Sequence, residues 1–143
     1  MNNLRITPLF FLIFLSSCYH DSPTPLSTSE LIAGVDEFGK TYQVNHITIE
    51  IGTVTPHECV TDNFITYYPN GRYEINEGAT KCNPNDSPAV VGFWRIDRSE
   101  TFLTVEIGDS TQVWEIESIE NSSHAVTSTF REGLRTYSFH SSN

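Results

Sequence analysis

The sequence has 143 residues, with 8 lysines and arginines against 18 aspartates and glutamates, and a formal net charge of −10. This length suits one domain built around one hydrophobic core. Phosphate groups are bound by clustered cations, so the acidic balance argues against binding of nucleic acid or of anionic lipid headgroups. The acidic residues are spread along the chain, which is typical of a solvated surface, although such a surface can still meet a basic partner protein.

The N-terminal segment has the pattern of an export signal. Arg5 gives it a weakly positive start, and residues 9–15 form an apolar run too short to cross a bilayer as a helix. The run ends in Leu15-Ser-Ser-Cys18, which resembles the lipobox of bacterial lipoproteins. The resemblance implies cleavage before Cys18, lipidation of its sulfur, and attachment to the outer membrane, on its periplasmic or outer surface. The alternative is an ordinary secretory signal in which Cys18 is incidental.

We therefore expect a signal peptide over residues 1–17, a lipidated flexible tether over 18–30 and one folded domain over 31–143. The tether is rich in proline, serine and threonine and has few large apolar groups to bury. At its end, residues 29–33 are compatible with one helical turn that stops at Gly34.

Eight segments alternate apolar and polar residues in the manner of β-strands. They are residues 42–51, 63–68, 73–76, 93–96, 102–107, 113–117, 125–130 and 134–139. Most of the links between them are short and polar, which implies an antiparallel meander, and eight strands suffice to close an up-and-down barrel. A change of parity within the first segment predicts a bulge near Asn45 or His46.

An immunoglobulin-like sandwich is the alternative all-β fold. That fold places its core tryptophan between two paired cysteines, whereas Trp94 and Trp114 both follow Cys82. No segment predicts a long helix, so an α/β enzyme fold is not expected.

Lipidation of Cys18 would leave Cys59 and Cys82 as a pair, and an exported protein can form this disulfide. Asn70-Gly71 predicts a two-residue hairpin turn. The register that follows from such a turn places residue 59 opposite residue 82. The bond would close a loop that contributes about 3.4 kcal/mol to stability. A zinc site is the alternative, but no second histidine flanks Cys82 to join His57.

The central part of the chain resembles the lipocalin-like domain of small lipoproteins from Gram-negative bacteria. The resemblance lies in Asp62-Asn-Phe64, Tyr68-Pro-Asn-Gly-Arg-Tyr73, Glu77-Gly-Ala-Thr-Lys-Cys82-Asn-Pro84 and Gly92-Phe-Trp94. Gly39-Lys-Thr-Tyr42 stands where members often have Gly-Lys-x-Trp. The resemblance covers about residues 31–139 and implies a half or full β-barrel on a lipid anchor, without assigning a function.

A set of aromatic side chains shares the parity that faces the barrel interior, and it is the candidate ligand site: Trp94, Trp114, Phe130, Tyr137 and Phe139. The apolar residues Ile96, Leu103, Val105, Ile116 and Val126 share this parity. An eight-stranded barrel is either filled by such side chains or holds one small ligand. In the second case we expect an apolar pocket at the open end, with polar groups such as Tyr137 and Ser128.

No catalytic residues, metal or cofactor are expected. The sequence has no Gly-x-Ser-x-Gly motif, and none of its five histidines has a metal-like or acid–base partner at local spacing. The histidines are therefore expected on the surface or at strand edges. Asn83, Asn85 and Asp86 have the composition of a calcium loop but lack its ligand spacing.

Asp109-Ser110-Thr111 resembles a bacterial O-glycosylation sequon, which makes Ser110 a candidate modification site in an expected hairpin turn. Two functions are compatible with these features. One is a carrier of a small apolar ligand at the cell envelope. The other is a protein-interaction module, such as an inhibitor or an accessory subunit of an envelope complex. A cavity would favour the carrier, and a filled core with an exposed aromatic patch would favour the module.

Overall fold

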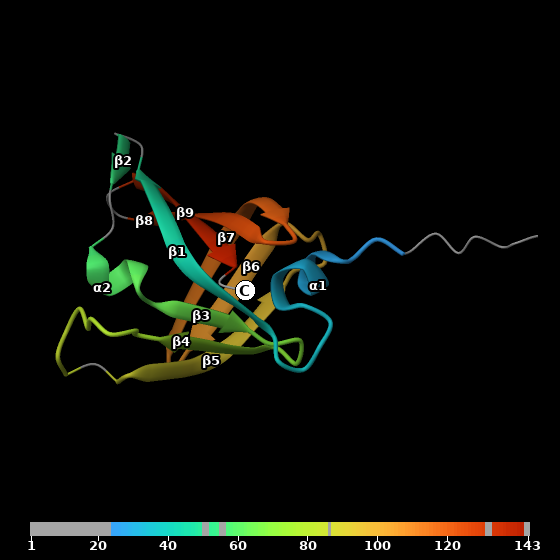
Figure 1. The fold of residues 1–143 in the computed structure, drawn as a ribbon. Helices are drawn as coiled ribbons and strands as arrows, with labels where there is room; N and C mark the ends of the chain where they lie inside the picture. Colours follow the sequence, from blue (N-terminus) through green and yellow to red (C-terminus); the bar gives the residue numbers. More distant parts are fainter. Residues whose placement is uncertain (1–23, 50–51, 55–56, 86, 131–132, 142–143) are drawn as a thin grey trace, which may run out of the picture.

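A computed structural model describes residues 24–49, 52–54, 57–85, 87–130 and 133–141. This part of the chain forms two short helices and nine strands (Figure 1). In chain order they are α1 (Thr28–Ala33), β1 (Lys40–Ile49), β2 (Gly52–Val54), α2 (Glu58–Thr61), β3 (Phe64–Tyr67), β4 (Arg72–Asn76), β5 (Ala89–Ile96), β6 (Phe102–Ile107), β7 (Ser110–Glu120), β8 (Ser123–Phe130) and β9 (Gly133–Ser141).

The strands form a closed antiparallel barrel. Their order is β2-β1-β3-β4-β5-β6-β7-β8-β9, and β9 also pairs with β1. The ring therefore contains β1 and β3 to β9, which are the eight predicted strands. The short β2 pairs only with the end of β1, from Ile47↔Val54 to Ile49↔Gly52, beyond the part of β1 that β3 covers. Neither β2 nor α2 was expected.

The register of β1 confirms the predicted bulge. Its pairing with β9 shifts between Val44 and His46. Such a bulge lets the strand bend and changes which face its side chains present. Tyr42 and Val44 consequently point into the barrel from the first half of the strand, and Ile47 packs against the same core from the second half.

The predicted two-residue turn between β3 and β4 is wrong. Tyr67 pairs with Tyr73, and the Tyr68 N–H donates to the oxygen of Arg72 at 3.0 Å, so the loop has three residues. Pro69 favours the first bend, and Gly71 takes a left-handed conformation with φ +84°. This shifts the register by one residue, so strand pairing does not place Cys59 opposite Cys82.

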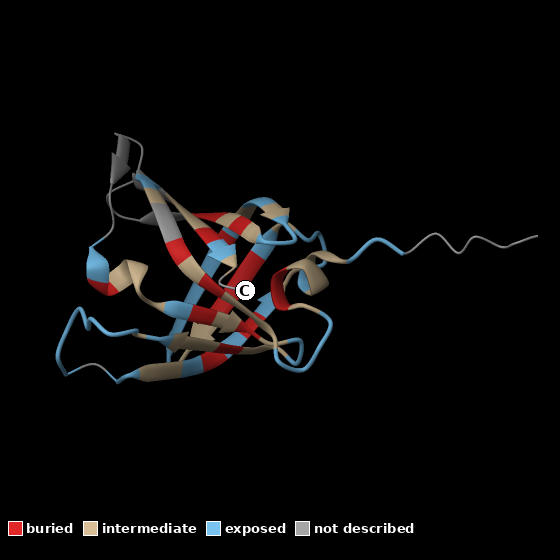
Figure 2. Ribbon diagram, in the orientation of Figure 1, coloured by how far each residue is buried: buried red, intermediate tan, exposed pale blue. Residues whose placement is uncertain are grey.

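Alternate residues along the strands face a common core, as the burial pattern shows (Figure 2). Leu103 and Val105 of β6, Trp94 of β5 and Val126 of β8 are buried, as their parity predicts. Ile96 and Ile116 are half-buried and pack against this core.

Helix α1 lies over one end of the barrel, where it buries Ile32 and Ala33 (Figure 1). Ser27 caps it through a reciprocal capping box with Glu30, and Gly34 ends it as predicted. The folded part thus includes residues 28–30, which were expected in the tether. Neither helix of the described chain is long and apolar enough to span a membrane.

Two side chains at the start of β1 bind the C-terminal carbonyls of α1. The Tyr42 hydroxyl donates to the oxygens of Ile32 at 2.9 Å and Leu31 at 3.2 Å. The Lys40 ammonium donates to the Leu31 oxygen at 2.9 Å and to the main-chain oxygen of Asn121 at 2.7 Å. These bonds satisfy carbonyls that have no partner within the helix, and they hold α1 against the barrel.

Candidate ligand cavity and its rim

The barrel interior has two halves of different character. The half under α1 is filled by aromatic rings that contact one another edge to face or in stacks. These rings belong to Tyr42, Tyr67, Tyr73, Trp94, His124 and Phe139. Among the described residues, this end of the barrel interior is therefore packed with aromatic side chains.

His124 belongs to this filled half, so its expected place at the surface or a strand edge is wrong. The ring is 2% exposed and stacks on Phe139 with centroids 4.6 Å apart. Neither ring nitrogen has a hydrogen-bond partner in the described structure. Burial, followed by the positive charge of Lys40, lowers the pKa of His124 to about 3. The histidine is consequently a neutral core residue at pH 7.

The half near α2 contains a cavity of about 210 Å³. Its wall is made of side chains from β1, α2, β3, β4, β6, β7 and β9 and is mainly apolar. The lining residues are Val44, Val60, Asn63, Ile65, Tyr73, Ile75, Val105, Ile107, Gln112, Trp114, Tyr137 and Phe139. The volume lies below the usual range of about 300–1,000 Å³ for ligand pockets and above the ~150 Å³ of an engineered cavity that binds benzene.

Three of the five predicted ligand-site residues line this cavity. Trp114 and Tyr137 stack with centroids 6.3 Å apart, and Phe139 continues the row. Trp94 does not line it, because its indole N–H donates to the Tyr68 oxygen at 2.9 Å and its ring packs against Tyr67. The backbone of Phe130 lies in β8, but its side chain and that of Ser128 fall outside the described residues.

Two polar atoms of lining residues have almost no accessible surface and no partner among the described residues. They are the Oδ1 oxygen of Asn63 and the Nε1 nitrogen of Trp114. A buried donor or acceptor without a partner costs about 1–3 kcal/mol. Asn63 and Val60 were not predicted as lining residues, because it is the unexpected helix α2 that brings both of them to the cavity.

A disulfide joins α2 to the loop between β4 and β5, next to the cavity. Cys59 of α2 is bonded to Cys82 of the loop between β4 and β5, with the two Cα atoms 5.0 Å apart. The predicted pair is therefore confirmed, although it joins a helix to a loop and does not cross a strand ladder. Because Val60 follows Cys59 and lines the cavity, this bond also positions part of the cavity wall.

Asp62, at the end of α2, gives the rim a second connection. Its Oδ2 oxygen accepts hydrogen bonds from the N–H groups of Ala79 at 3.0 Å and Thr80 at 2.7 Å. Gly78 packs so closely on Asp62 that a Cβ atom there would overlap the Asp62 carbonyl. The Glu-Gly-Ala-Thr-Lys-Cys segment thus fastens the β4–β5 loop to α2, whose Val60 lines the cavity.

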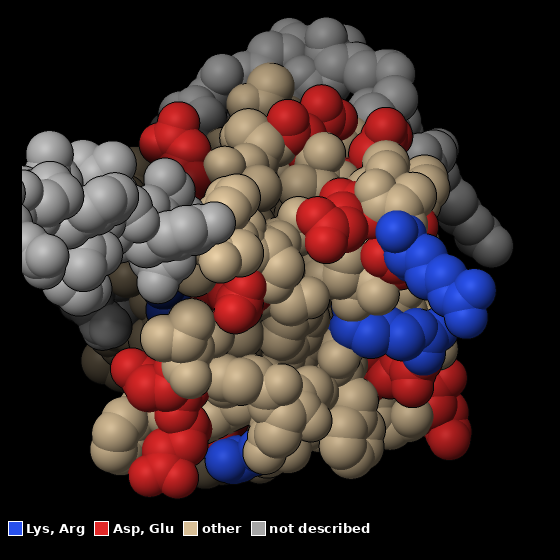
Figure 3. Space-filling view, turned by 90° about the vertical axis from the view of Figure 1, so that its right-hand side faces the viewer, with Lys and Arg blue, Asp and Glu red and all other residues tan. Residues whose placement is uncertain are grey.

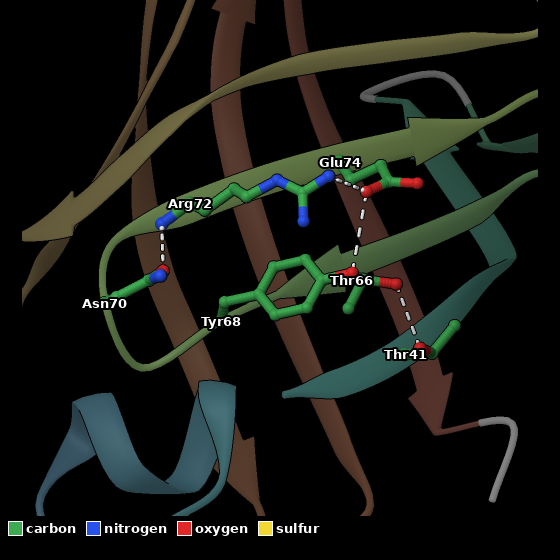
Figure 4. Close-up of polar contacts among 6 residues, drawn as sticks. All are labelled: Thr41, Thr66, Tyr68, Asn70, Arg72 and Glu74. Atoms are coloured by element: carbon green, nitrogen blue, oxygen red, sulfur yellow. Dashed lines mark hydrogen bonds and ion pairs between the residues drawn. The ribbon is translucent and has the colours of Figure 1, made fainter. Parts of the chain in front are cut away.

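The outer face of the barrel has polar and apolar regions. On β3 and β4, Arg72 pairs with Glu74 at 2.5 Å and lies over the Tyr68 ring, and Thr41 bonds Thr66 across β1 and β3 (Figure 4). On β5 and β7, Phe93 is 67% exposed and Val113 is 54% exposed. These are outward-facing apolar side chains with no described element over them.

No group of three or more histidine, cysteine, aspartate or glutamate side chains gathers as a metal site in the described part of the chain. Ser110 is exposed but is the first residue of β7, paired with Ile107, one position past the turn in which it was expected.

No protein family matches the chain as a whole or in part. No curated protein matches it either. Among solved structures, it is similar to a lipocalin-like protein from Bacteroides uniformis, with a TM-score of 0.51 and 10% sequence identity. The match covers 71% of this chain and 94% of the other. At this identity the likeness concerns the fold, and the chain accordingly has a lipocalin-like barrel.

Proposed function

We propose that this protein is a non-enzymatic lipoprotein of the cell envelope whose barrel binds a small apolar ligand. The observation that carries the proposal is the cavity at the α2 end, which Trp114, Tyr137 and Phe139 line together with aliphatic side chains. A barrel whose interior is only half filled has room for one small ligand. The similarity to a lipocalin-like protein supports the fold on which this proposal rests.

Bromobenzene tests the cavity, because bromine quenches tryptophan fluorescence on contact and the ring is close in size to the benzene that a ~150 Å³ cavity holds. We expect saturable quenching of the purified protein, since Trp114 lines the cavity. Val60→Phe narrows the cavity and should reduce the quenching. Val113→Phe makes the same change on the outer face and should preserve it. Equal quenching of both variants would contradict binding in the cavity.

The lipid anchor is supported by the lipobox-like Leu15-Ser-Ser-Cys18, which lies outside the described residues. The described chain enters the fold at α1, and α2, beside the cavity, is at the other end of the barrel (Figure 1), so a lipid upstream of the described residues would be attached at the end away from the cavity. Acidic side chains are spread over the face viewed in Figure 3, a pattern unsuited to nucleic acid or anionic headgroups. Multiple acyl chains at Cys18 would still hold the protein firmly.

Replacing Cys18 with serine should release the protein from membrane fractions and abolish palmitate labelling. Cys59→Ser, which changes a cysteine that bears no lipid, is the matched control and should leave labelling intact. If the Cys18→Ser variant stays on the membrane with unchanged labelling, the anchor is wrong.

A protein-interaction module is the second candidate function, and the exposed Phe93 and Val113 favour it. Phe93→Ser should then weaken capture of a partner from an envelope extract, whereas Val60→Phe should not. The reverse order of effects would assign the binding to the cavity.

A further inference from the structure

We infer that the loop between α1 and β1, residues 34–39, contacts the membrane surface together with Leu26, and that this contact fits lipids with zwitterionic headgroups. The inference rests on the lipid anchor of the proposed function and adds a second contact between the protein and the membrane. Its basis is the exposure, the rigidity and the position of three apolar side chains at the α1 end of the barrel.

Three large apolar side chains of this end are open to solvent. Phe38 is 77% exposed, Val35 is 72% exposed and Leu26 is 46% exposed. Phe38 and Val35 are the two most exposed large apolar residues of the described chain. Leu26 and Val35 line the same surface hollow of about 250 Å³. Exposed apolar side chains that gather on one surface are typical of sites that contact a partner or a membrane.

The loop that carries two of these side chains is fixed at both ends. At its start, the N–H of Gly34 donates to a carbonyl of α1 at 2.9 Å. At its end, Gly39 packs so closely on Tyr67 that a Cβ atom there would overlap the Tyr67 oxygen. Within the loop, Asp36 Oδ1 accepts a hydrogen bond from the N–H of Phe38 at 3.1 Å. The loop is therefore preorganised, so a membrane contact would need little further ordering of the chain.

The loop lies at the end of the barrel to which a lipid would be attached. Thr24, the first described residue, is six positions after Cys18 and precedes α1 (Figure 1). An extended chain advances at most about 3.6 Å per residue, so a lipid-bearing Cys18 would lie within about 22 Å of Thr24. So short a connection turns the α1 end toward the bilayer, which favours a membrane over a protein as the partner of this surface.

The charges around the loop favour one class of headgroup. Asp36 and Glu37 stand between the two apolar side chains of the loop, and residues 24–39 contain no lysine or arginine. The next residue, Lys40, uses its ammonium group on main-chain oxygens. Uncharged side chains make up much of the end viewed in Figure 3, with acidic groups scattered among them. Anionic lipids would repel these carboxylates, whereas the ammonium groups of zwitterionic lipids can lie beside them.

Quenching by brominated lipid tests the contact with two matched variants. Phe38→Trp and Phe93→Trp each add a tryptophan at an exposed phenylalanine, one in the loop and one on the outer face of β5, while both native tryptophans are at most 8% exposed. The full-length proteins, purified with their lipid, are reconstituted in vesicles of dibrominated phosphatidylcholine. We expect Phe38→Trp to lose about half or more of its added fluorescence, because interfacial side chains lie about 5–10 Å deep, close to the bromines. Phe93→Trp should lose little, and Val35→Trp repeats the measurement if Phe38→Trp does not fold.

The headgroup class has its own test. Vesicles that include phosphatidylglycerol, an anionic lipid, should quench Phe38→Trp less, and added salt should restore the quenching. Stronger quenching on the anionic vesicles would overturn the assignment to zwitterionic headgroups.

The remaining outcomes separate the contact from the anchor. Equal quenching of Phe38→Trp and Phe93→Trp, or no quenching of a protein that floats with the vesicles, would overturn the membrane contact while the anchor stands. A protein that neither floats with the vesicles nor takes up palmitate would overturn the anchor, and the inference with it.

Discussion

The hydroxyl of Tyr42 donates a hydrogen bond to the main-chain oxygen of Ile32 at 2.9 Å, which joins the first strand of the barrel to the end of α1. A phenol reaches the helix carbonyls here, and burial raises the pKa of Tyr42 to about 12, so it remains a donor at neutral pH. The end of the barrel that α1 covers therefore depends on a specific hydrogen bond as well as on apolar packing.

Tyr42→Phe should lower the free energy of unfolding by about 1–3 kcal/mol, because the carbonyl of Ile32 loses its buried donor while the ring is kept. Tyr68→Phe is the matched control. Its hydroxyl is 3.5 Å from Glu74 on the half-buried outer face, and its loss should cost under about 0.5 kcal/mol. Urea unfolding of both variants measures the difference, and equal losses would contradict a special role of Tyr42.

The buried His124 predicts a loss of stability in mild acid. Its pKa is lowered in the folded state to about 3, so between this value and about 6.5 the unfolded chain binds more protons than the folded one. The contribution of neutral His124 to the free energy of unfolding is full above pH 6.5. It falls as the pH falls, by about 2 kcal/mol between pH 7 and pH 5.

Unfolding curves at pH 7 and pH 5 measure this slope. His124→Phe keeps an aromatic ring in the core and should flatten it. The exposed His140 offers the matched change, and His140→Phe should retain the slope. A slope that survives in His124→Phe would show that another group carries the acid sensitivity.

Removal of the disulfide should loosen the cavity rim. The double variant Cys59→Ser with Cys82→Ser should lose about 2–4 kcal/mol of stability and still show a β-sheet circular dichroism spectrum, because the barrel strands do not depend on this bond. Cys18→Ser should retain the stability. Thiol titration of the unfolded, unreduced protein provides the chemical check: if Cys59 and Cys82 react there, the bond is absent from the native protein.

Gly78 and Gly108 form a natural pair for testing the rim. Both have φ +55°, a conformation that side chains rarely adopt. Only Gly78 would place a Cβ atom against Asp62, while Gly108 has open space. Gly108→Ala should cost about 1 kcal/mol for the strained backbone. Gly78→Ala should lower the stability clearly more than Gly108→Ala does. Thermal melting of the two variants measures the difference, and similar losses of stability would show that the contact with Asp62 is unimportant.

Ser110 remains a candidate for glycosylation because Asp109-Ser110-Thr111 lies at an exposed turn and strand start. Intact-mass measurement of the protein from its native host should show added hexose mass that Ser110→Ala removes. Ser123→Ala, a matched change at the start of β8, should leave the added mass in place.

The strands were predictable from sequence because successive side chains of a strand point to opposite faces, which gives an alternating apolar and polar pattern. Phe93 on the outer face and Trp94 in the core are an example. The cavity was predictable only in part. Trp94 and Trp114 share the parity that faces the interior. Parity does not say how far along the barrel axis a side chain lies, and this position decides whether the side chain belongs to the filled half or to the cavity. The four-residue α2 was missed because so short a helix leaves no periodic pattern, and with it Val60 and Asn63 were missed.

The hairpin between β3 and β4 shows a different limit. Asn70-Gly71 is the usual sign of a two-residue turn, but Pro69 before it supports a loop one residue longer. His124 was expected at the surface or a strand edge because it precedes the predicted strand at residues 125–130 and has no metal-like or acid–base partner at local spacing. The rings of Tyr42, Tyr67 and Phe139, from three other strands, make its position in the core favourable.

The pairing of β1 with β9 joins the first strand of the barrel to the last. Because a chain is made and delivered from its N-terminus, β1 emerges with one of its edges unsatisfied until nearly all of the remaining sequence has followed. During that interval the edge is open to other extended chains, and a closing contact of such large sequence separation slows folding. The seam between these two strands is therefore the point at which newly made molecules are most exposed to misassembly, and the point at which a folding helper would have the most effect.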